Sequence, residues 1–305
     1  MTTKVKKFSN SLDVFPIGIG TFPFDEEVWG PIDEKGAIDI LLTAYEKGVN
    51  YFNSAYYYGK GRCEKILGKA VKKMDREKVV VATKVGTEFG EFSLSKKRIN
   101  KSIESILRRM KLEYVDILIL HRPDPNTSIE ETLDAMLDLK NKGLIKSIGI
   151  SNFPINLSTR VLKMVPIRVF EFYFSLLNQK EGNKILKFCR ENGIIATPYK
   201  VIERGILTDA FSLDNDYVIK LNQKYENPYT KAENLHKTNK LILKLREFAK
   251  QRGLTLAQLA IAWVLNQGEE IISLIGVRSK AHQIEDLKAV GVKLTEADLL
   301  SMRIL

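Results

Sequence analysis

Three side chains that can hold or transfer a proton stand near the ends of three consecutive apolar runs. Tyr58 comes shortly after the run VNYFNSA, Lys84 lies within VVVATKV, and His121 ends VDILILH. A free phenol has a pKa near ~10, and a nearby ammonium group lowers that value. A phenol tuned in this way can donate a proton to a carbonyl oxygen, and a neutral imidazole can donate a second hydrogen bond to it. Because an unpaired ammonium inside an apolar strand is costly, we expect Lys84 to face a polar cavity and a partner.

Eight short apolar runs rich in Val, Ile and Phe predict the strands that carry these side chains. The runs are mostly continuous rather than alternating, which is typical of parallel strands buried on both faces. A helical pattern follows each run, and eight such units fit an α/β fold, a single (β/α)8 TIM barrel domain over residues 1–305. The predicted strands are 15–21, 49–55, 79–85, 115–121, 147–153, 169–175, 193–199 and 271–277, and the predicted helices are 34–47, 62–73, 94–110, 129–142, 155–163, 180–192, 255–267 and 279–290.

Two segments lie outside these eight units. Residues 3–14 carry a turn signal, Ser-Asn-Ser, between short apolar stretches, and they predict an N-terminal β-hairpin. Residues 208–238 are polar and irregular, and 239–252 predict an extra helix before the last βα unit. A long excursion after the seventh strand lies on the C-terminal side of a barrel, where binding and catalytic residues gather.

The composition narrows the classes of partner. The chain carries 48 Lys and Arg against 37 Asp and Glu, a net charge of +11. The basic residues are mixed with acidic ones along helical faces, and no basic tail or nucleic-acid motif occurs, so we expect solvated surfaces and no nucleic-acid partner. No apolar run reaches the ~18–20 residues that span a bilayer, and the first residues lack the apolar segment of a signal peptide.

Cysteine usage indicates a reducing compartment and no metal centre. Cys63 and Cys189 both fall in predicted helices, and no CxxC spacing occurs. We interpret them as reduced structural thiols in a cytoplasmic protein. Without a CxxC, an HxxH or a carboxylate cluster to hold a metal, a hydride donor would have to be an organic cofactor.

Beyond these three side chains, the sequence resembles the aldo-keto reductase superfamily nearly from end to end. The resemblance implies a (β/α)8 enzyme that reduces a small-molecule carbonyl compound and binds NADP(H), or less often NAD(H), across the barrel mouth. The absence of a GxGxxG motif agrees with that implication, while the substrate and the oligomeric state stay open. The matching motifs are IGIGT, GVNYFNSAYYYG with EKILGKAV, VATKVG, VDILILHRPD, LKNKGLIKSIGISNF, TLAQLAIAWVL and IGVRSKAHQIEDLKA.

The resemblance also assigns roles to individual residues. It places the catalytic tyrosine at Tyr58, the lysine at Lys84 and the histidine at His121, with Trp29 in the wall of the substrate pocket. The resemblance makes Arg278 the best candidate to bind the 2′-phosphate of NADP(H), because a guanidinium suits that dianion. The implied cofactor-binding positions are Gly20 and Thr21 at the nicotinamide, Ser151, Asn152 and Glu171 at its carboxamide, Tyr199 against its ring, Lys200, Gly205 and Leu207 in the loop over the pyrophosphate, Gly276 and Arg278 at the adenosine phosphate, and His282, Glu285 and Asp286 near the adenine.

Asn53 departs from this pattern, because it stands where the family normally has a catalytic aspartate. An asparagine can accept a hydrogen bond from Lys84 but cannot neutralise it. Three outcomes stay open: Lys84 lowers the tyrosine pKa more strongly, Lys84 itself loses its proton more easily, or the site is impaired. Glu171, Lys200 and Asp286 are further departures, in place of glutamine, serine and asparagine. The alternatives to a reductase are a nucleotide-binding regulatory or redox-sensing protein with little turnover, and a lyase on the same barrel.

Overall fold

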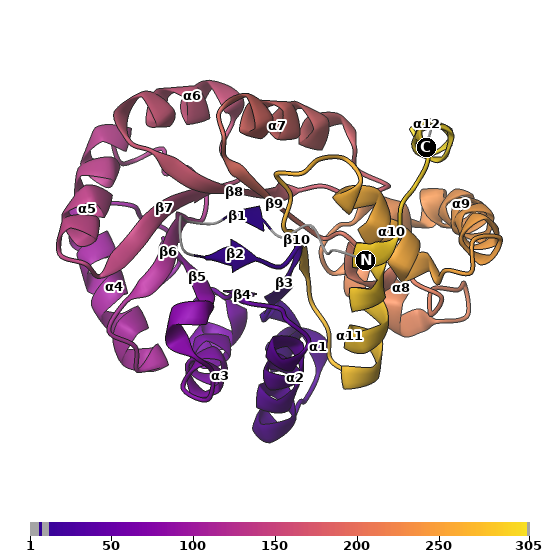
Figure 1. The fold of residues 1–305 in the computed structure, drawn as a ribbon, viewed down its shortest axis with the longest axis horizontal. Helices are drawn as coiled ribbons and strands as arrows, with labels where there is room; N and C mark the ends of the chain where they lie inside the picture. The colour runs from indigo at the N-terminus through magenta and orange to yellow at the C-terminus, as the bar shows by residue number, and fades with distance from the viewer. Residues whose placement is uncertain (1–5, 8–11, 304–305) are drawn as a thin grey trace.

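Eight parallel strands form one sheet, in the order β10-β3-β4-β5-β6-β7-β8-β9. The structure, a computed structural model, describes residues 6–7 and 12–303. A parallel bridge between Ala196 and Ile271 joins the two edges of the sheet, so the strands make a barrel (Figure 1). This arrangement confirms the predicted fold. The strands are β3 (Ile17–Gly20), β4 (Tyr51–Asn53), β5 (Val80–Val85), β6 (Val115–Leu120), β7 (Ile145–Ser151), β8 (Ile167–Tyr173), β9 (Ile195–Tyr199) and β10 (Ser273–Ile275).

Helices surround the strands, and several begin at a side-chain cap. The Asp33 carboxylate accepts from the Gly36 amide, and the Ser128 hydroxyl accepts from the Glu131 amide. These caps satisfy amide groups that have no partner inside the helix. The helices are α1 (Glu26–Trp29), α2 (Glu34–Glu46), α3 (Arg62–Val71), α4 (Lys96–Met110), α5 (Ile129–Asn141), α6 (Ile155–Met164), α7 (Lys180–Glu191), α8 (Asp216–Gln223), α9 (Ala232–Lys250), α10 (Leu256–Leu265), α11 (Lys280–Leu287) and α12 (Glu296–Ser301).

Alternate residues along the strands fill the interior of the barrel. A buried apolar cluster contains Tyr51 of β4, Val80 and Ala82 of β5, Ile119 of β6 and Val169 of β8, among others. Because side chains alternate with a period of two, the next inward positions toward the C-terminal end of the barrel are polar. They are Asn53, Lys84, His121, Glu171 and Tyr199.

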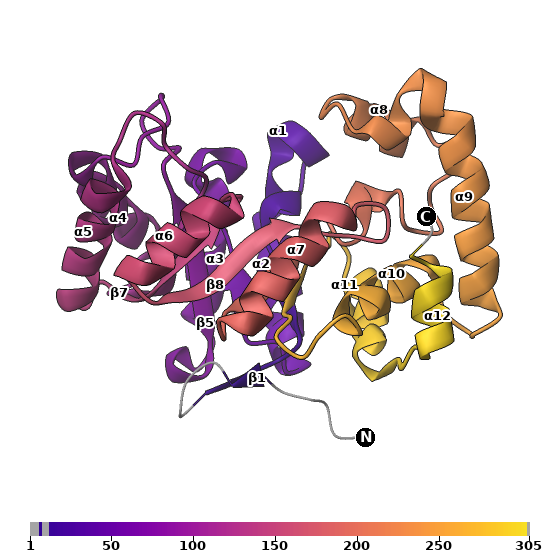
Figure 2. The same cartoon turned by 90° about the horizontal axis from the view of Figure 1, so that it is seen from above.

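The N-terminal hairpin closes the other end of the barrel. β1 (Lys6–Lys7) pairs antiparallel with β2 (Asp13–Val14), which confirms the predicted hairpin, and the predicted turn between them lies outside the described residues. Val14 belongs to the same buried cluster as the inward strand residues. Figure 2 shows β1 on the side of the barrel opposite α1 and α8.

The excursion after β9 is more regular than the sequence indicates. Residues 208–238 include α8 and the start of α9, which begins at Ala232 rather than near residue 239. The polar composition hid α8, whose Val218, Leu221 and Asn222 are buried at helical spacing. The helix α12 was also not predicted, although Thr295 and Asp298 form its capping box.

Two further expectations can be compared with the described part of the chain. Cys63 on α3 and Cys189 on α7 are buried free thiols. Burial raises the pKa of Cys63 to about 12, so this thiol stays protonated. In the described ranges, no helix has both the length and the apolar character that crossing a membrane requires.

Candidate active site

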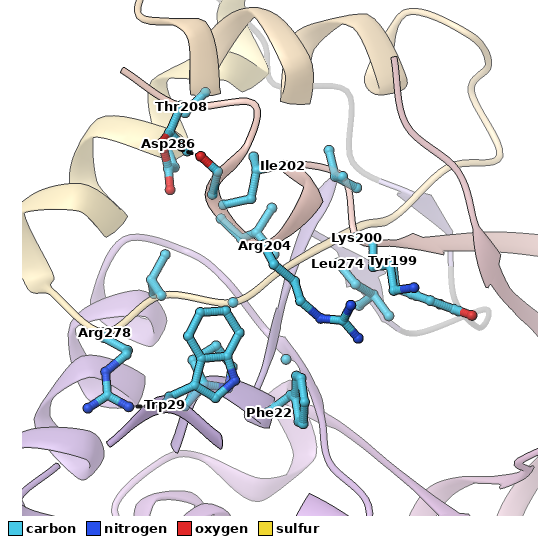
Figure 3. A pocket seen from close by; sticks show the side chains of 18 of the residues that line it. Phe22, Trp29, Tyr199, Lys200, Ile202, Arg204, Thr208, Leu274, Arg278 and Asp286 are labelled. Carbon is cyan, nitrogen blue, oxygen red and sulfur yellow. Dashed lines mark hydrogen bonds between the residues drawn. The ribbon is translucent and has the colours of Figure 1, made fainter. Parts of the chain in front are cut away.

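A cavity of about 690 Å³ opens at the C-terminal ends of the strands. Its walls come from strand ends, from the loops after β3, β4, β9 and β10, and from residues of α8, α10 and α11. Figure 3 shows Phe22, Trp29, Arg204 and Arg278 around it. Four of the predicted site residues lie behind the lining and are fully buried: Thr21, Lys84, Ser151 and Leu207. The predicted residues that line the cavity are Gly20, Trp29, Asn53, Tyr58, His121, Asn152, Glu171, Tyr199, Lys200, Gly205, Gly276, Arg278, His282, Glu285 and Asp286.

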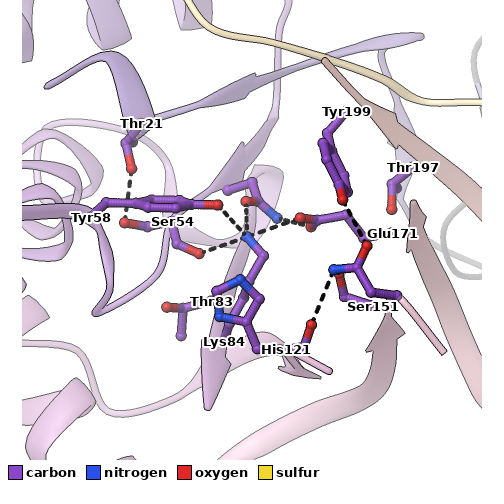
Figure 4. A network of polar contacts seen from close by, with 12 residues as sticks. Thr21, Ser54, Tyr58, Thr83, Lys84, His121, Ser151, Glu171, Thr197 and Tyr199 are labelled. Atoms are coloured by element: carbon purple, nitrogen blue, oxygen red, sulfur yellow. Dashed lines mark hydrogen bonds and ion pairs between the residues drawn. The ribbon is translucent and has the colours of Figure 1, made fainter. Parts of the chain in front are cut away.

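Lys84 is the centre of a polar network at the floor of the cavity (Figure 4). Its ammonium donates to Asn53 Oδ1 at 2.6 Å, to the Tyr58 hydroxyl at 3.1 Å and to the Ser54 carbonyl at 3.2 Å. It also forms an ion pair with Glu171 Oε1 at 3.1 Å. Lys84 therefore has the polar partners that its place in an apolar strand predicts.

Charge in this network favours a protonated Lys84. Burial by itself lowers the pKa of Lys84, but the Glu171 carboxylate and the Tyr58 oxygen raise it, and the net shift is upward. Asn53 carries no charge, yet its amide donates from Nδ2 to Glu171 Oε2 at 2.8 Å. The ammonium form of Lys84 is therefore stabilised in this site, and the three outcomes for Asn53 that the sequence left open stay predictions.

Tyr58 points its hydroxyl into the cavity beside this ammonium. Tyr58 lies in the turn after β4. The same turn contains Gly61, which has a φ of +88°, and a Cβ atom added to Gly61 would lie 2.8 Å from Arg109 Cδ. The Phe22 ring packs at 5.0 Å from the Tyr58 ring, between centroids. Burial raises the pKa of Tyr58, and the Lys84 ammonium only partly offsets it. Lys84 thus acts in the expected direction, but the net pKa of Tyr58 is raised, because moving a phenolate out of water costs more than the nearby ammonium returns.

His121 lies on the same floor as a neutral imidazole. Burial, followed by repulsion from Lys84 and Arg122, lowers the pKa of His121 to about 3. Its Nδ1 is buried and has no hydrogen-bond partner among the described residues. A neutral imidazole can donate a hydrogen bond to a carbonyl oxygen that approaches Tyr58.

The residues expected at a carboxamide sit on the neighbouring strand ends. Asn152, with a left-handed φ of +57°, donates from Nδ2 to Ser151 Oγ at 3.0 Å and to the His121 carbonyl at 3.3 Å. Its Oδ1 accepts from the Tyr199 hydroxyl at 2.7 Å. The Tyr199 ring is stacked on the Tyr173 ring, with centroids 6.1 Å apart. These contacts give one side of the cavity a polar edge and an aromatic face.

The far end of the cavity contains acidic and basic groups from α11 and the loop before it. The Arg278 guanidinium donates to the backbone carbonyls of Pro23 at 2.6 Å, Pro31 at 2.7 Å and Gly30 at 3.1 Å. Burial, together with repulsion from Glu285, raises the pKa of Asp286 to about 7. Arg278 thus both lines the cavity and holds the loop after β3.

Arg204 is the main cavity residue that was not singled out from the sequence. Its guanidinium lies 4.0 Å from the centre of the Tyr225 ring, and its Nη1 has no hydrogen-bond partner in the described ranges. The backbone there is left-handed, with a φ of +48°. The sequence signal was weak, because an arginine in a polar loop is usually solvated. Phe22 and Tyr225 also line the cavity and were not singled out from the sequence.

The described residues contain no group of three or more His, Cys, Asp or Glu side chains that could hold a metal ion. The polar groups of the cavity are instead amides, hydroxyls, cations and single carboxylates. Such groups can orient an organic ligand in a cavity through hydrogen bonds and charge.

The chain matches a known protein family over nearly its whole length. A model of the aldo/keto reductase family matches residues 16–304. The chain belongs to the aldo/keto reductase family. It is 31% identical over 301 residues to a probable aldo-keto reductase of Glycine max, which covers 97% of this chain and 86% of that protein.

The names of two other relatives specify different cofactors. The NADH-specific methylglyoxal reductase of Escherichia coli is 28% identical, covering 98% of this chain and 97% of that protein. The NADP(+) aldo-keto reductase yakc of Schizosaccharomyces pombe is 29% identical, covering 99% and 91%. Among solved structures, a glycerol dehydrogenase of Gluconobacter oxydans superimposes with a TM-score of 0.87 at 25% identity, over 100% of this chain and 95% of that one.

Proposed function

We propose that this protein is an NADP(H)-dependent reductase of small aldehydes or ketones in which Tyr58 is the proton donor. The observation that carries the proposal is the 3.1 Å hydrogen bond from Lys84 Nζ to the Tyr58 hydroxyl at the floor of the cavity. His121, neutral beside it, adds a second donor for the carbonyl oxygen.

In this mechanism the nicotinamide, when bound, supplies a hydride to the carbonyl carbon. Tyr58 gives its phenolic proton to the carbonyl oxygen as that oxygen gains negative charge, so the product is an alcohol. The O–H bond that breaks leaves a phenolate, which the Lys84 ammonium stabilises. Proton donation from a positioned acid typically contributes about 10²–10⁴-fold to a rate.

The residues around the cavity fit a dinucleotide. Arg204 Nη1 has no hydrogen-bond partner in the part of the chain that the structure describes, and the Lys200 ammonium lies 4.4 Å from the Tyr173 ring centre. These two cations would hold the pyrophosphate, and Arg278 would meet the 2′-phosphate. The carboxamide of the nicotinamide would bind to Ser151, Asn152 and Glu171, and the nicotinamide ring would lie against Tyr199. The adenine would lie near His282, Glu285 and Asp286.

The preference for NADP(H) rests on this chain's own cations, because the relatives name both cofactors. Among the described residues, the lysine and arginine side chains that line the cavity are Lys200, Arg204 and Arg278. A cofactor with an additional phosphate gains more from them than one without it.

A regulatory protein with little turnover is the competing function, and Asn53 was its main support. That support is weaker once Lys84 has a carboxylate partner in Glu171 at 3.1 Å. Turnover by the unmodified protein separates the two functions, and it should be measured as NADPH oxidation with a panel of aldehydes and ketones.

The variant Tyr58→Phe tests the proton donor. We expect kcat to fall by roughly 10²–10⁴-fold while the Kd for NADPH, followed by fluorescence, stays within about twofold, because the lost interaction belongs to the transition state. Tyr56→Phe is the matched control. The Arg109 guanidinium lies 4.8 Å from the centre of the Tyr56 ring. The Tyr56→Phe variant should therefore keep the kcat of the unmodified protein. Equal losses in the two variants would exclude Tyr58 as the donor.

A further inference from the structure

Lys84 has a counter-ion, and it comes from an unexpected strand. The Lys84 side chain is fully buried, so its positive charge requires a negative partner nearby. Among the described residues, one carboxylate pairs with it, that of Glu171 on β8, at 3.1 Å. The neighbouring position on β4, where the family resemblance expects a carboxylate, holds the neutral Asn53.

Lys84, Asn53 and Glu171 form a closed triangle. Lys84 donates to Asn53 Oδ1 at 2.6 Å, and Asn53 Nδ2 donates to Glu171 Oε2 at 2.8 Å. The third side is the ion pair between Glu171 Oε1 and Lys84. Since an ammonium only donates, the amide must turn its oxygen to Lys84 and its nitrogen to the carboxylate.

This triangle needs one amide and one carboxylate. Two carboxylates would bring two anionic oxygens together at 2.8 Å, the distance that now separates Asn53 Nδ2 from Glu171 Oε2. Two amides would leave the buried ammonium without a counter-ion. The neutral Asn53 and the charged Glu171 therefore depend on one another.

We propose that Glu171 is the positioning residue that supplies the negative charge of this site, with Asn53 as the neutral bridge that aims it at Lys84. Glu171 then acts through Lys84 on the Tyr58 hydroxyl, 3.1 Å from the ammonium. The proposal rests on the proposed function for its catalytic consequence. It also predicts that glutamine, the residue expected at position 171 from the resemblance, is harmful in this chain.

The test exchanges the amide and the carboxylate. Glu171→Gln alone removes the counter-ion, so we expect kcat to fall at least about tenfold. The basic limb of the pH–rate profile should move down by about one pH unit or more, because Lys84 and Tyr58 lose their protons more easily without the nearby negative charge. Asn53→Asp alone adds a second carboxylate, and the basic limb should move up.

The double variant Asn53→Asp with Glu171→Gln restores one carboxylate and one amide around Lys84. We expect its kcat within about threefold of the unmodified protein and its basic limb returned to the original pH. If Glu171 only held the cofactor, Glu171→Gln would raise the KM for NADPH without moving the pH profile, and Asn53→Asp would not rescue it. That pattern would overturn the proposal.

A control and a second measurement separate this proposal from the proposed function. Glu88→Gln alters another fully buried carboxylate, outside the cavity, that accepts from Ser102 Oγ at 3.1 Å, and it should leave the pH profile unchanged. Thermal unfolding needs no substrate: Glu171→Gln should lower Tm by roughly 5 °C, and the double variant should recover it. Absent turnover in every protein, with this Tm pattern, would reject the reductase and keep the ion pair. An unchanged Tm in Glu171→Gln would overturn the ion pair itself.

Discussion

At the scale of single residues, burial decides the protonation states around the cavity. It raises the pKa of Tyr58, lowers that of His121 to about 3 and raises that of Asp286 to about 7. The first two keep proton donors in their neutral forms over the ordinary range of pH. The third places a carboxyl group that titrates near neutrality at the end of the cavity proposed for the adenosine.

Asp286 should make the stability of the fold depend on pH. Its carboxyl has an ordinary pKa of 3.8 and one of about 7 in the folded protein, where burial disfavours the ion. Between these values the folded protein binds more protons than the unfolded chain, so its contribution to the free energy of unfolding decreases as pH rises. Asp286→Asn removes this titration. Urea unfolding at about pH 5 and about pH 8 should show the variant gaining stability over the unmodified protein at the higher pH. Equal differences at the two pH values would contradict the prediction.

The same titration should reach the proposed cofactor. Ionised Asp286 would repel an anionic dinucleotide, so the Kd for NADPH should rise as pH passes through about 7, and Asp286→Asn should flatten that rise. Fluorescence titrations from about pH 6 to about pH 8.5 measure both curves.

At the scale of elements, two arginines hold the loop after β3. Arg278 donates to three carbonyls of this loop, and Arg62 donates to the carbonyls of Phe24 at 2.8 Å and Ile32 at 2.9 Å. Of the two, Arg278 lines the cavity. A comparison of the two arginines can therefore distinguish support of the loop from binding of a phosphate.

Arg278→Ala and Arg62→Ala form a matched pair for that separation. Both variants lose contacts to the loop, and Arg278→Ala also loses the proposed contact to the 2′-phosphate. We expect Arg278→Ala to weaken NADPH binding by about 10–100-fold, equivalent to ~1.5–3 kcal/mol, and NADH binding by much less. Arg62→Ala should change the two cofactors to a similar, smaller extent. If both variants weaken NADPH binding equally, Arg278 acts through the loop alone.

At the scale of the whole molecule, the net charge of +11 should accelerate the arrival of an anionic cofactor. A positive protein attracts anions over distances that salt screens, with a Debye length of about 10 Å at 0.1 M and about 30 Å at 0.01 M. The association rate constant of NADPH, measured by stopped-flow fluorescence, should therefore fall as salt increases over this range. NADH carries less negative charge and serves as the control, with a weaker dependence. Identical slopes for the two cofactors would contradict the prediction.

The fold was readable from local patterns. The eight strands and the helices between them follow from continuous apolar runs that alternate with amphipathic segments, and each predicted strand overlaps an observed one. The helices α8 and α12 were missed because both are short, and α8 lies within a stretch that is polar as a whole. Their stability comes from packing against the rest of the molecule, which a local pattern does not contain.

The sequence by itself determined which side chains stand at the strand ends, since the period of two in a strand sets which of them point inward. Only the tertiary structure decided how they pair. Asn53 and Glu171 lie 118 residues apart along the chain, and Arg278 lies 255 residues from Pro23. The sequence presented Asn53 as a missing charge and Glu171 as a separate departure. Barrel closure brings both onto one ammonium, because a buried cation must find its anion wherever the fold places one.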